Sequence, residues 1–166
     1  ANTDVRNKED KRSSVKNVDY TDYEEDIFVG YRYFDSFGKQ VSYPFGYGLS
    51  YSDFTYEKIE SVKQDKKNIR VTVSVKNTSG RDGEEVVQLY TSYPDSKVER
   101  PSKQLRAFKR IPIKAGETRE VTLTVPKEEL GYWNEEKQMF VVEPGTVKLL
   151  IGASSEDIRL EGKIRL

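Results

Sequence analysis

The sequence predicts an all-β protein, an antiparallel β-sandwich preceded by an extended, aromatic-rich arm. From about residue 54 onward, apolar and polar residues alternate with a period of two, the pattern of strands that have one buried and one solvated face. Clusters of turn residues interrupt this alternation repeatedly. No helical pattern stands between the strands to serve as the crossover that a parallel sheet needs. An antiparallel sandwich accounts for all three observations.

The clearest predicted strand is Ile69–Lys76, in which apolar residues alternate strictly with polar ones. The predicted strands are Phe54–Val62, Ile69–Lys76, Glu85–Tyr93, Gln104–Ile113, Val121–Val125, Trp133–Val142, Val147–Ile151 and Ile158–Leu166. One helical turn is expected at Pro126–Leu130, because proline suits the first helical position and Gly131 suits the stop. Short strands in this number are typical of an immunoglobulin-like or fibronectin type III-like sandwich.

The core must be held by packing alone, because the chain has no cysteine and hence no disulfide. We expect Trp133 to anchor one end of this core together with Tyr132 or Phe140, since large rings bury much apolar surface. A sugar-stacking role for Trp133 is the alternative, and it requires an exposed ring. Three further residues are expected in the core, namely Leu89, Leu105 and Phe108.

Composition divides the chain into three parts. Residues 1–26 are polar and densely charged, which predicts a linker. Residues 27–56 form the aromatic arm, a connector between domains, with one short strand expected at Phe28–Phe34 and a turn at Ser36–Lys39. Residues 57–166 form the sandwich.

The segment Tyr43–Tyr51 combines aromatic residues with glycines in a way that neither a helix nor a strand would use. Pro44 favours an extended approach, while Gly46 and Gly48 permit positive φ, so the rings project from different sides of a tight loop. Most of the aromatic residues lie within residues 20–56. At roughly 150 Å² per ring they could bury about 2,000 Å², the scale of an obligate interface.

Composition also excludes several classes of function. Lysine plus arginine and aspartate plus glutamate number 28 each, so no overall field attracts nucleic acid or an anionic membrane. Histidine and cysteine are both absent, which removes the commonest general base, the commonest zinc ligands and a thiol nucleophile. No apolar run approaches the roughly 20 residues of a membrane-spanning helix. We therefore expect no cofactor, no metal, no nucleic acid and no membrane as partners.

Acidic residues are abundant, and we expect nearly all of them to be solvated surface. Adjacent acidic residues point to opposite faces of an extended chain, and these lie in polar stretches where burial is small. They are Glu24-Glu25-Asp26, Glu84-Glu85, Glu128-Glu129 and Glu135-Glu136. Asp35 is the exception, because it follows an aromatic run, and we expect a structural ion pair with Arg32 rather than a catalytic role. No catalytic residue is assigned.

Two motifs in fixed order, Ile27–Asp35 (IFVGYRYFD) and Tyr43–Tyr51 (YPFGYGLSY), resemble the C-terminal region of glycoside hydrolase family 3, the β-glucosidase and β-xylosidase group. Later segments resemble landmarks of that family's fibronectin type III-like domain, namely Gly83–Tyr90, Arg100–Arg110, Glu143–Gly145 and Ile151–Ser155. The resemblance covers about residues 20–166. It implies that the nucleophile and the acid/base lie in domains upstream of this region, so neither can be carried onto this chain.

The resemblance implies a non-catalytic C-terminal accessory portion of a family 3 β-glycosidase, an enzyme that hydrolyses terminal β-linked sugars. We expect this chain to be inactive alone and to stabilise and dock onto the catalytic domains. The expected inter-domain interface consists of Tyr31, Arg32, Tyr33, Phe34, Phe45, Tyr47 and Tyr51. For Tyr47 an alternative is a place at the rim of the substrate pocket, where it would stack on a distal sugar.

Two other classes of function stay open. A free-standing carbohydrate-binding module would need exposed aromatic residues along one face of the sandwich, and an adhesion or scaffolding sandwich would need no enzyme at all. The region accompanies family members of different sugar specificity, so it predicts no particular sugar. We expect a periplasmic or secreted bacterial location.

Overall fold

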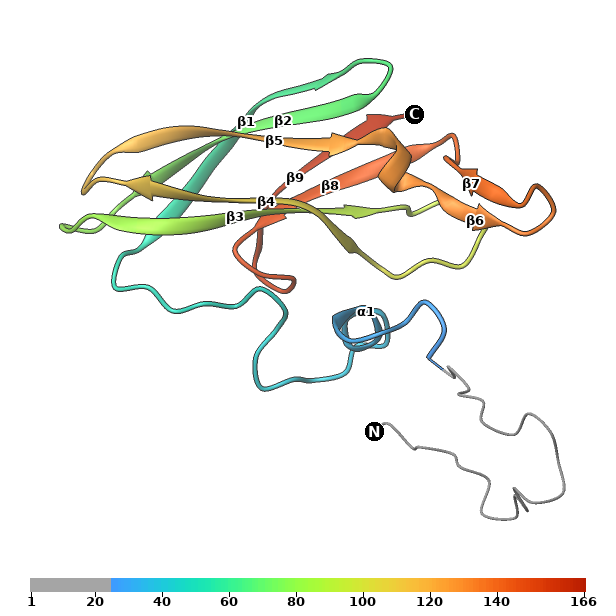
Figure 1. Ribbon diagram of the computed structural model, residues 1–166. Coiled ribbons are helices and arrows are strands. Elements are labelled where there is room, and N and C mark those ends of the chain that lie inside the picture. Colours follow the sequence, from blue (N-terminus) through green and yellow to red (C-terminus); the bar gives the residue numbers. More distant parts are fainter. Residues whose placement is uncertain (1–24) are drawn as a thin grey trace, which may run out of the picture.

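The computed structural model describes residues 25–166, which form two facing antiparallel sheets with an arm along one side (Figure 1). The elements are α1 (Tyr31–Ser36), β1 (Phe54–Gln64), β2 (Asn68–Asn77), β3 (Gly83–Ser92), β4 (Gln104–Ile113), β5 (Thr118–Pro126), η1 (Lys127–Leu130), β6 (Tyr132–Asn134), β7 (Met139–Val141), β8 (Thr146–Gly152) and β9 (Ile158–Arg165). Of the predicted linker, residues 1–26, the structure describes only residues 25 and 26. Glu24 therefore lies outside the described residues.

The two sheets have the strand orders β1-β2-β5 and β4-β3-β8-β9, and every neighbouring pair is antiparallel. The all-β sandwich is therefore confirmed. One predicted strand, Trp133–Val142, is instead a hairpin of two short strands, β6 and β7, which pair with each other at one end of the sandwich (Figure 1). The polar residues between β6 and β7 make the turn that a single strand would have had to include.

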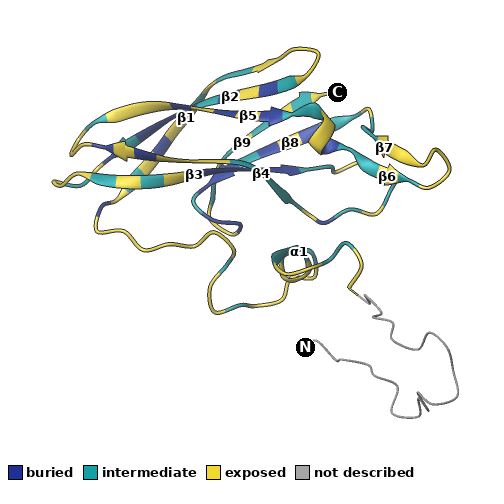
Figure 2. Ribbon diagram, viewed as in Figure 1, coloured by how far each residue is buried: buried dark blue, intermediate teal, exposed yellow. Residues whose placement is uncertain are grey.

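Alternate residues of the facing strands make the core, as the period of two predicts. In β2 and β5 the apolar residues face inward, and the register sets Val73 opposite Val121. The four-stranded sheet supplies the other half, which includes the expected core residue Leu89 at 0% exposure. Figure 2 shows that buried residues lie along the strands of both sheets. The fully buried apolar residues include Ile69, Val71, Val75, Val87, Val125, Leu130, Leu149 and Ile151.

The prediction of burial was wrong for two of the expected core residues. Phe108 is 68% exposed, because Ala107 turns inward in β4 and the period of two then directs Phe108 to the outer face. Trp133 is 48% exposed, because the β6–β7 hairpin leaves the main sheets, and its ring meets Phe140 edge-on with centroids 5.4 Å apart. Leu105 is only half-buried.

The single helical turn is confirmed as η1, preceded by Pro126 and followed by Gly131, whose N–H donates to the Glu128 carbonyl at 3.1 Å. Leu130, at its end, is fully buried. This turn closes the end of the core that Trp133 was expected to close.

The strand expected at Phe28–Phe34 is wrong, since α1 begins at Tyr31. Gly30, at φ 61°, reverses the chain just before the helix. Helical spacing then lets Tyr33 contact Phe37 four residues later, with ring centroids 5.0 Å apart. The expected turn follows at Phe37 and Gly38.

We expect Leu89→Ala to lower the free energy of unfolding by about 2–5 kcal/mol, because it leaves a cavity in a closed core. Phe108→Ala should change it by less than about 0.5 kcal/mol, because the ring is on the surface. Chemical denaturation of the two variants measures both values. Similar losses in the two variants would contradict the outward placement of Phe108.

Candidate inter-domain interface

The last three residues of the predicted arm, 54–56, belong to β1, and residues 27–53 run along the outer side of the four-stranded sheet before the chain enters β1 (Figure 1). Hydrogen bonds join its loop to β3 and to the β8–β9 turn, where the N–H of Ser155 donates to the carbonyl of Phe45 at 2.8 Å. The arm therefore has one side held against its own sandwich and another side that faces away from it.

A buried amide in β3 holds the loop. Gln88 points to the outer face of the sheet, and its Nε2 donates to the carbonyl of Gly46 at 3.0 Å and to the carbonyl of Ala153. Its Oε1 accepts from the hydroxyl of Tyr90 at 2.6 Å. Both amide protons and the carbonyl oxygen are thus satisfied, as burial of the group requires.

This contact accounts for the glycine of the loop. Gly46 has φ 81°, and a Cβ at this position would lie 2.1 Å from Oε1 of Gln88. Both the backbone conformation and the close approach therefore exclude a side chain. The positive φ expected at Gly46 is confirmed, whereas Gly48 does not have one.

Aromatic stacking forms a second attachment. The ring of Tyr31 stacks on that of Phe45 with centroids 4.2 Å apart and meets the edge of the Tyr90 ring at 6.4 Å. The Tyr31 hydroxyl also accepts from the backbone N–H of Leu105 at 2.9 Å. Tyr31 thus joins the helix, the loop and the sheet.

Asp35 forms a third attachment, with a partner other than the one expected. Its side chain is only 2% exposed, and its Oδ2 lies 3.5 Å from Nζ of Lys103, while Ser155 Oγ donates to Oδ1 at 3.4 Å. The expected pair with Arg32 is wrong, because α1 turns Asp35 toward the sandwich and places Arg32 in a cleft beside Arg106. A buried carboxylate with a lysine partner is costly to disrupt, so this pair fixes the orientation of α1.

The other side of the arm is a surface of exposed apolar side chains. Of the seven residues expected at the interface, five are exposed here, whereas Tyr31 and Arg32 are half-buried against the sandwich. The exposed five are Tyr33, Phe34, Phe45, Tyr47 and Tyr51. The sequence reasoning did not include four more exposed neighbours, Val29, Phe37, Tyr43 and Leu49. We call these nine residues the arm surface.

Five rings of the arm surface contact one another. Tyr43 and Tyr47 lie with centroids 5.4 Å apart, and Tyr33 touches both Phe34 and Phe37. Tyr51 is 92% exposed. Exposed apolar patches of this kind generally mark a site of interaction, because a monomer gains nothing from leaving them in water.

Sequence reasoning missed the anchors of the arm, namely Gln88, Lys103 and Ser155. One signal was available, because Gln88 interrupts the otherwise apolar run Val86–Leu89 of a central strand. A polar side chain at such a position has to find a partner above the sheet.

A second cleft lies beneath the later part of the arm, lined by Ser52, Glu85 and Arg159 among others. The Tyr56 hydroxyl donates to Oε1 of Glu85 at 3.0 Å, and the guanidinium of Arg159 lies 4.9 Å from the Tyr56 ring centre. Burial raises the pKa of Glu85 and of Tyr56. Glu85 is thus half-buried rather than fully solvated as expected, whereas Glu84 is exposed.

The charged and polar groups in this cleft pair with one another. Arg159 binds the carboxylate of Asp157 at 2.6 Å, so that the second carboxyl near Glu85 is already paired. Within residues 25–166, no group of three or more acidic side chains could hold a metal ion. No helix of this part of the chain is long and apolar enough to cross a membrane.

We expect Gly46→Ala to destabilise the protein by roughly 2–4 kcal/mol, since it adds steric overlap with Gln88 to the strain of positive φ. Gly38→Ala is the matched control, because Gly38 also has positive φ, at 59°, but nothing lies within 4 Å of its Cβ position. Thermal unfolding measures the difference. Equal losses in the two variants would show that the Gln88 contact does not hold the loop.

The raised pKa of Glu85 predicts that the free energy of unfolding depends on pH. Because burial raises its pKa above the ordinary 4.5, the folded state keeps this proton to a higher pH than the unfolded state does. The contribution is fully present below the unfolded pKa and is lost as the pH rises through the folded pKa. Glu85→Gln should therefore lose less stability than the parent chain as the pH rises above about 4.5. Urea unfolding across pH measures this, with Glu161→Gln on β9 as control, and parallel curves for Glu85→Gln and the parent would refute it.

Comparison with known proteins identifies the family. A model of the fibronectin type III-like domain matches residues 85–155. Thermostable beta-glucosidase B of Acetivibrio thermocellus is 41% identical over 151 residues, which cover 89% of this chain and 20% of that protein. An exo-alpha-(1->6)-L-arabinopyranosidase of Bifidobacterium longum is 40% identical over 139 residues, covering 84% of this chain and 18% of that protein.

A solved structure has the same fold. Beta-glucosidase 3B from Thermotoga neapolitana, in complex with alpha-D-glucose, matches with a TM-score of 0.80 and 42% identity, covering 86% of this chain and 20% of that one. This chain therefore spans about a fifth of the length of the relatives it matches. It corresponds to the fibronectin type III-like region of β-glucosidase-like members of glycoside hydrolase family 3.

Proposed function

We propose that this chain is the non-catalytic accessory portion of a family 3 β-glycosidase, and that its arm docks onto the catalytic domains and stabilises them. The two-sided construction of the arm is the observation that carries this proposal. Gln88, Tyr31 and Asp35 fix one side to the sandwich, while the arm surface stays outside the core. A surface fixed in advance loses little conformational entropy when it binds.

The size of the surface fits a permanent interface within one chain. Nine large apolar residues at roughly 100 Å² or more of buried area each would remove about 1,000 Å² from water on this side, which lies in the range of stable interfaces. The relatives supply the partner in principle, since about four-fifths of their length lies beyond the part matched here.

The substrate of the parent enzyme is expected to be a terminal β-linked sugar. The relatives carry different activities in their names, beta-glucosidase in one and exo-alpha-(1->6)-L-arabinopyranosidase in another, at nearly equal identity to this chain. Similarity to these relatives therefore does not indicate which sugar the parent enzyme takes. We place the parent enzyme in the periplasm or outside the cell.

Tyr51 tests the docking role, because its ring is almost free in this chain. Tyr51→Ala should leave the unfolding of the isolated chain within about 0.5 kcal/mol of the parent. In the full-length enzyme the same change should cost roughly 3–5 kcal/mol, since there the ring would be fully buried. Met139→Ala, which changes an exposed apolar side chain on the β6–β7 hairpin, should be silent in both.

Kinetics separate docking from substrate binding. If Tyr47 docks, Tyr47→Ala in the full-length enzyme lowers the melting temperature and reduces activity on short and long substrates alike. A loss confined to KM for longer substrates, with an unchanged melting temperature, would instead place Tyr47 at the rim of the pocket. A Tyr51→Ala enzyme as stable as its parent would contradict the docking proposal.

A further inference from the structure

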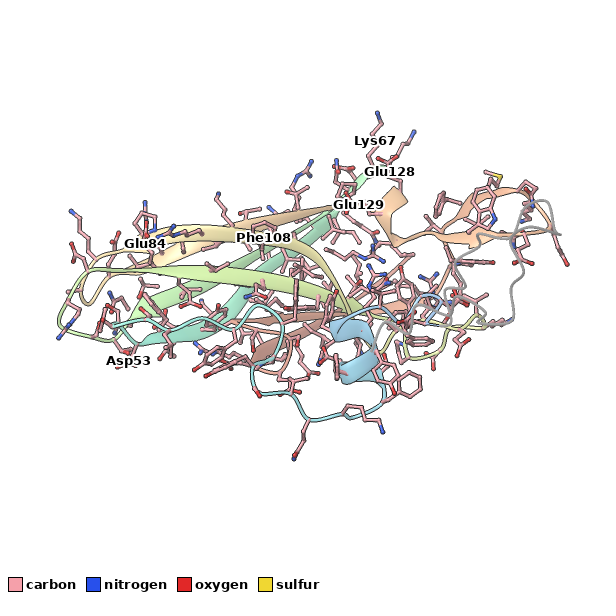
Figure 3. All side chains as sticks on the ribbon, turned by 60° about the horizontal axis from the view of Figure 1, so that its bottom comes forward. Asp53, Lys67, Glu84, Phe108, Glu128 and Glu129 are labelled. Atoms are coloured by element: carbon pink, nitrogen blue, oxygen red, sulfur yellow. The ribbon has the colours of Figure 1, made fainter. Side chains whose placement is uncertain are left out.

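A cleft of about 650 Å³ lies apart from the arm surface, between the β6–β7 hairpin, the segment leading into β4 and the start of the arm. Figure 3 shows two of its rim residues, Glu128 and Glu129, at one end of the sandwich, while Asp53 and Glu84 lie at the other end. The volume lies within the usual range of ligand-binding pockets.

A buried arginine lines this cleft. The side chain of Arg100 is only 8% exposed, and its guanidinium lies over the ring of Tyr93, 4.1 Å from the centre. Its Nη1 donates to the carbonyl of Leu130 at 3.2 Å, and its Nε lies 3.6 Å from Oε2 of Glu143. Its Nη2 is buried without a hydrogen-bond partner among residues 25–166. An unpaired buried donor is costly. Because Nη2 is closed to solvent, a ligand in the cleft would use the more exposed polar groups that line it.

The remaining polar groups supply both donors and acceptors. Arg106 and Arg32 line the cleft, and burial, with the like charge of Arg32, lowers the pKa of Arg106. The carboxylates of Glu99, Glu128 and Glu129 also line it. Including Arg100, three guanidinium groups thus meet three carboxylates in one cleft. This balance of charge disfavours both an anion and a cation, and it suits a neutral ligand that donates and accepts hydrogen bonds.

An exposed aromatic wall completes the cleft. Trp133 and Phe140 line it, and each leaves about half or more of its surface in solvent. Their edge-on contact, with centroids 5.4 Å apart, fixes the two rings relative to each other. A flat apolar ring beside planar polar groups complements a molecule with one apolar face and a polar edge.

We propose that this cleft is a binding site for a neutral oligosaccharide, which stacks a pyranose ring on Trp133 and directs its hydroxyl groups to Arg106 and to Glu128 or Glu129. A pyranose has C–H groups on its faces and hydroxyl groups at its edge, so it uses the aromatic wall and the charged groups together. None of the nine residues of the arm surface lines the cleft, so the site does not rest on the docking proposal.

The chain carries one tryptophan, so its fluorescence reports directly on the cleft. Titration of the full 166-residue chain with cellotetraose, used as a neutral oligosaccharide probe, should shift the emission of Trp133 in a saturable way at millimolar concentrations. Trigalacturonic acid, an anionic probe, should bind more weakly. No saturable shift with cellotetraose, or tighter binding of the anionic probe, would overturn the proposal.

Variants locate the site by calorimetry or by NMR titration. Trp133→Ala should weaken cellotetraose binding by about fivefold or more, and Trp133→Phe should retain part of it, because a ring remains. Arg106→Gln should weaken binding as well, whereas Phe108→Ala, an exposed ring elsewhere, should not. Thermal unfolding confirms that each variant is folded. Binding that survives both Trp133→Ala and Arg106→Gln in folded protein would place the saccharide elsewhere and refute this site.

Discussion

One buried amide, that of Gln88, determines how the arm and the sandwich are joined. A glutamine on the outer face of a central strand would be costly to bury alone, and three partners satisfy it here, the carbonyls of Gly46 and Ala153 and the hydroxyl of Tyr90. Because the amide is directional, it fixes the position of the loop as well as holding it. The stacking of Tyr31 on Phe45 and the burial of Asp35 both depend on a loop that is already in place.

As a consequence, the two sides of the arm make different contacts. Polar and backbone groups of the arm are used against the sandwich, and most of its large side chains remain outward. The sandwich itself closes without them, since η1 and Leu130 complete its core at one end. Aromatic residues that a single domain does not need for its own core are therefore free to serve a contact with another body.

The period of two predicted the strands well, because burial of one face imposes that period on every strand of a sandwich. Gln104–Ile113 was predicted with its observed bounds, and the proline and glycine around η1 were sufficient to locate a single turn. The same period does not say which of two adjacent residues faces inward when both are apolar, and so Phe108 was assigned to the wrong face. Trp133 was misplaced because hydrophobicity predicts burial only on average.

The candidate site was predicted only in part, for a physical reason. The aromatic richness of the arm is visible in the sequence, and most of the expected residues are exposed. Their division between inward and outward sides is set by α1 and by contacts far away in the chain. The partner of Asp35 illustrates this. Lys103 lies just before β4, three strands further along the chain, and no local pattern pairs the two residues.

The long sequence separation between the arm and its anchors also sets the order in which they are synthesised and come into contact. Gly46 and Gln88 lie 42 positions apart, and Asp35 and Ser155 lie 120 apart, so each anchor of the arm is synthesised after the arm itself. The arm leaves the ribosome before its anchors do and can attach to the sandwich only when β3, and then the β8–β9 turn, have formed, because contacts across long loops follow closure of those loops. During that interval its rings have no partner in the sandwich. Chaperone contact and aggregation of a nascent or misfolded chain should therefore concentrate on this segment rather than on the strands.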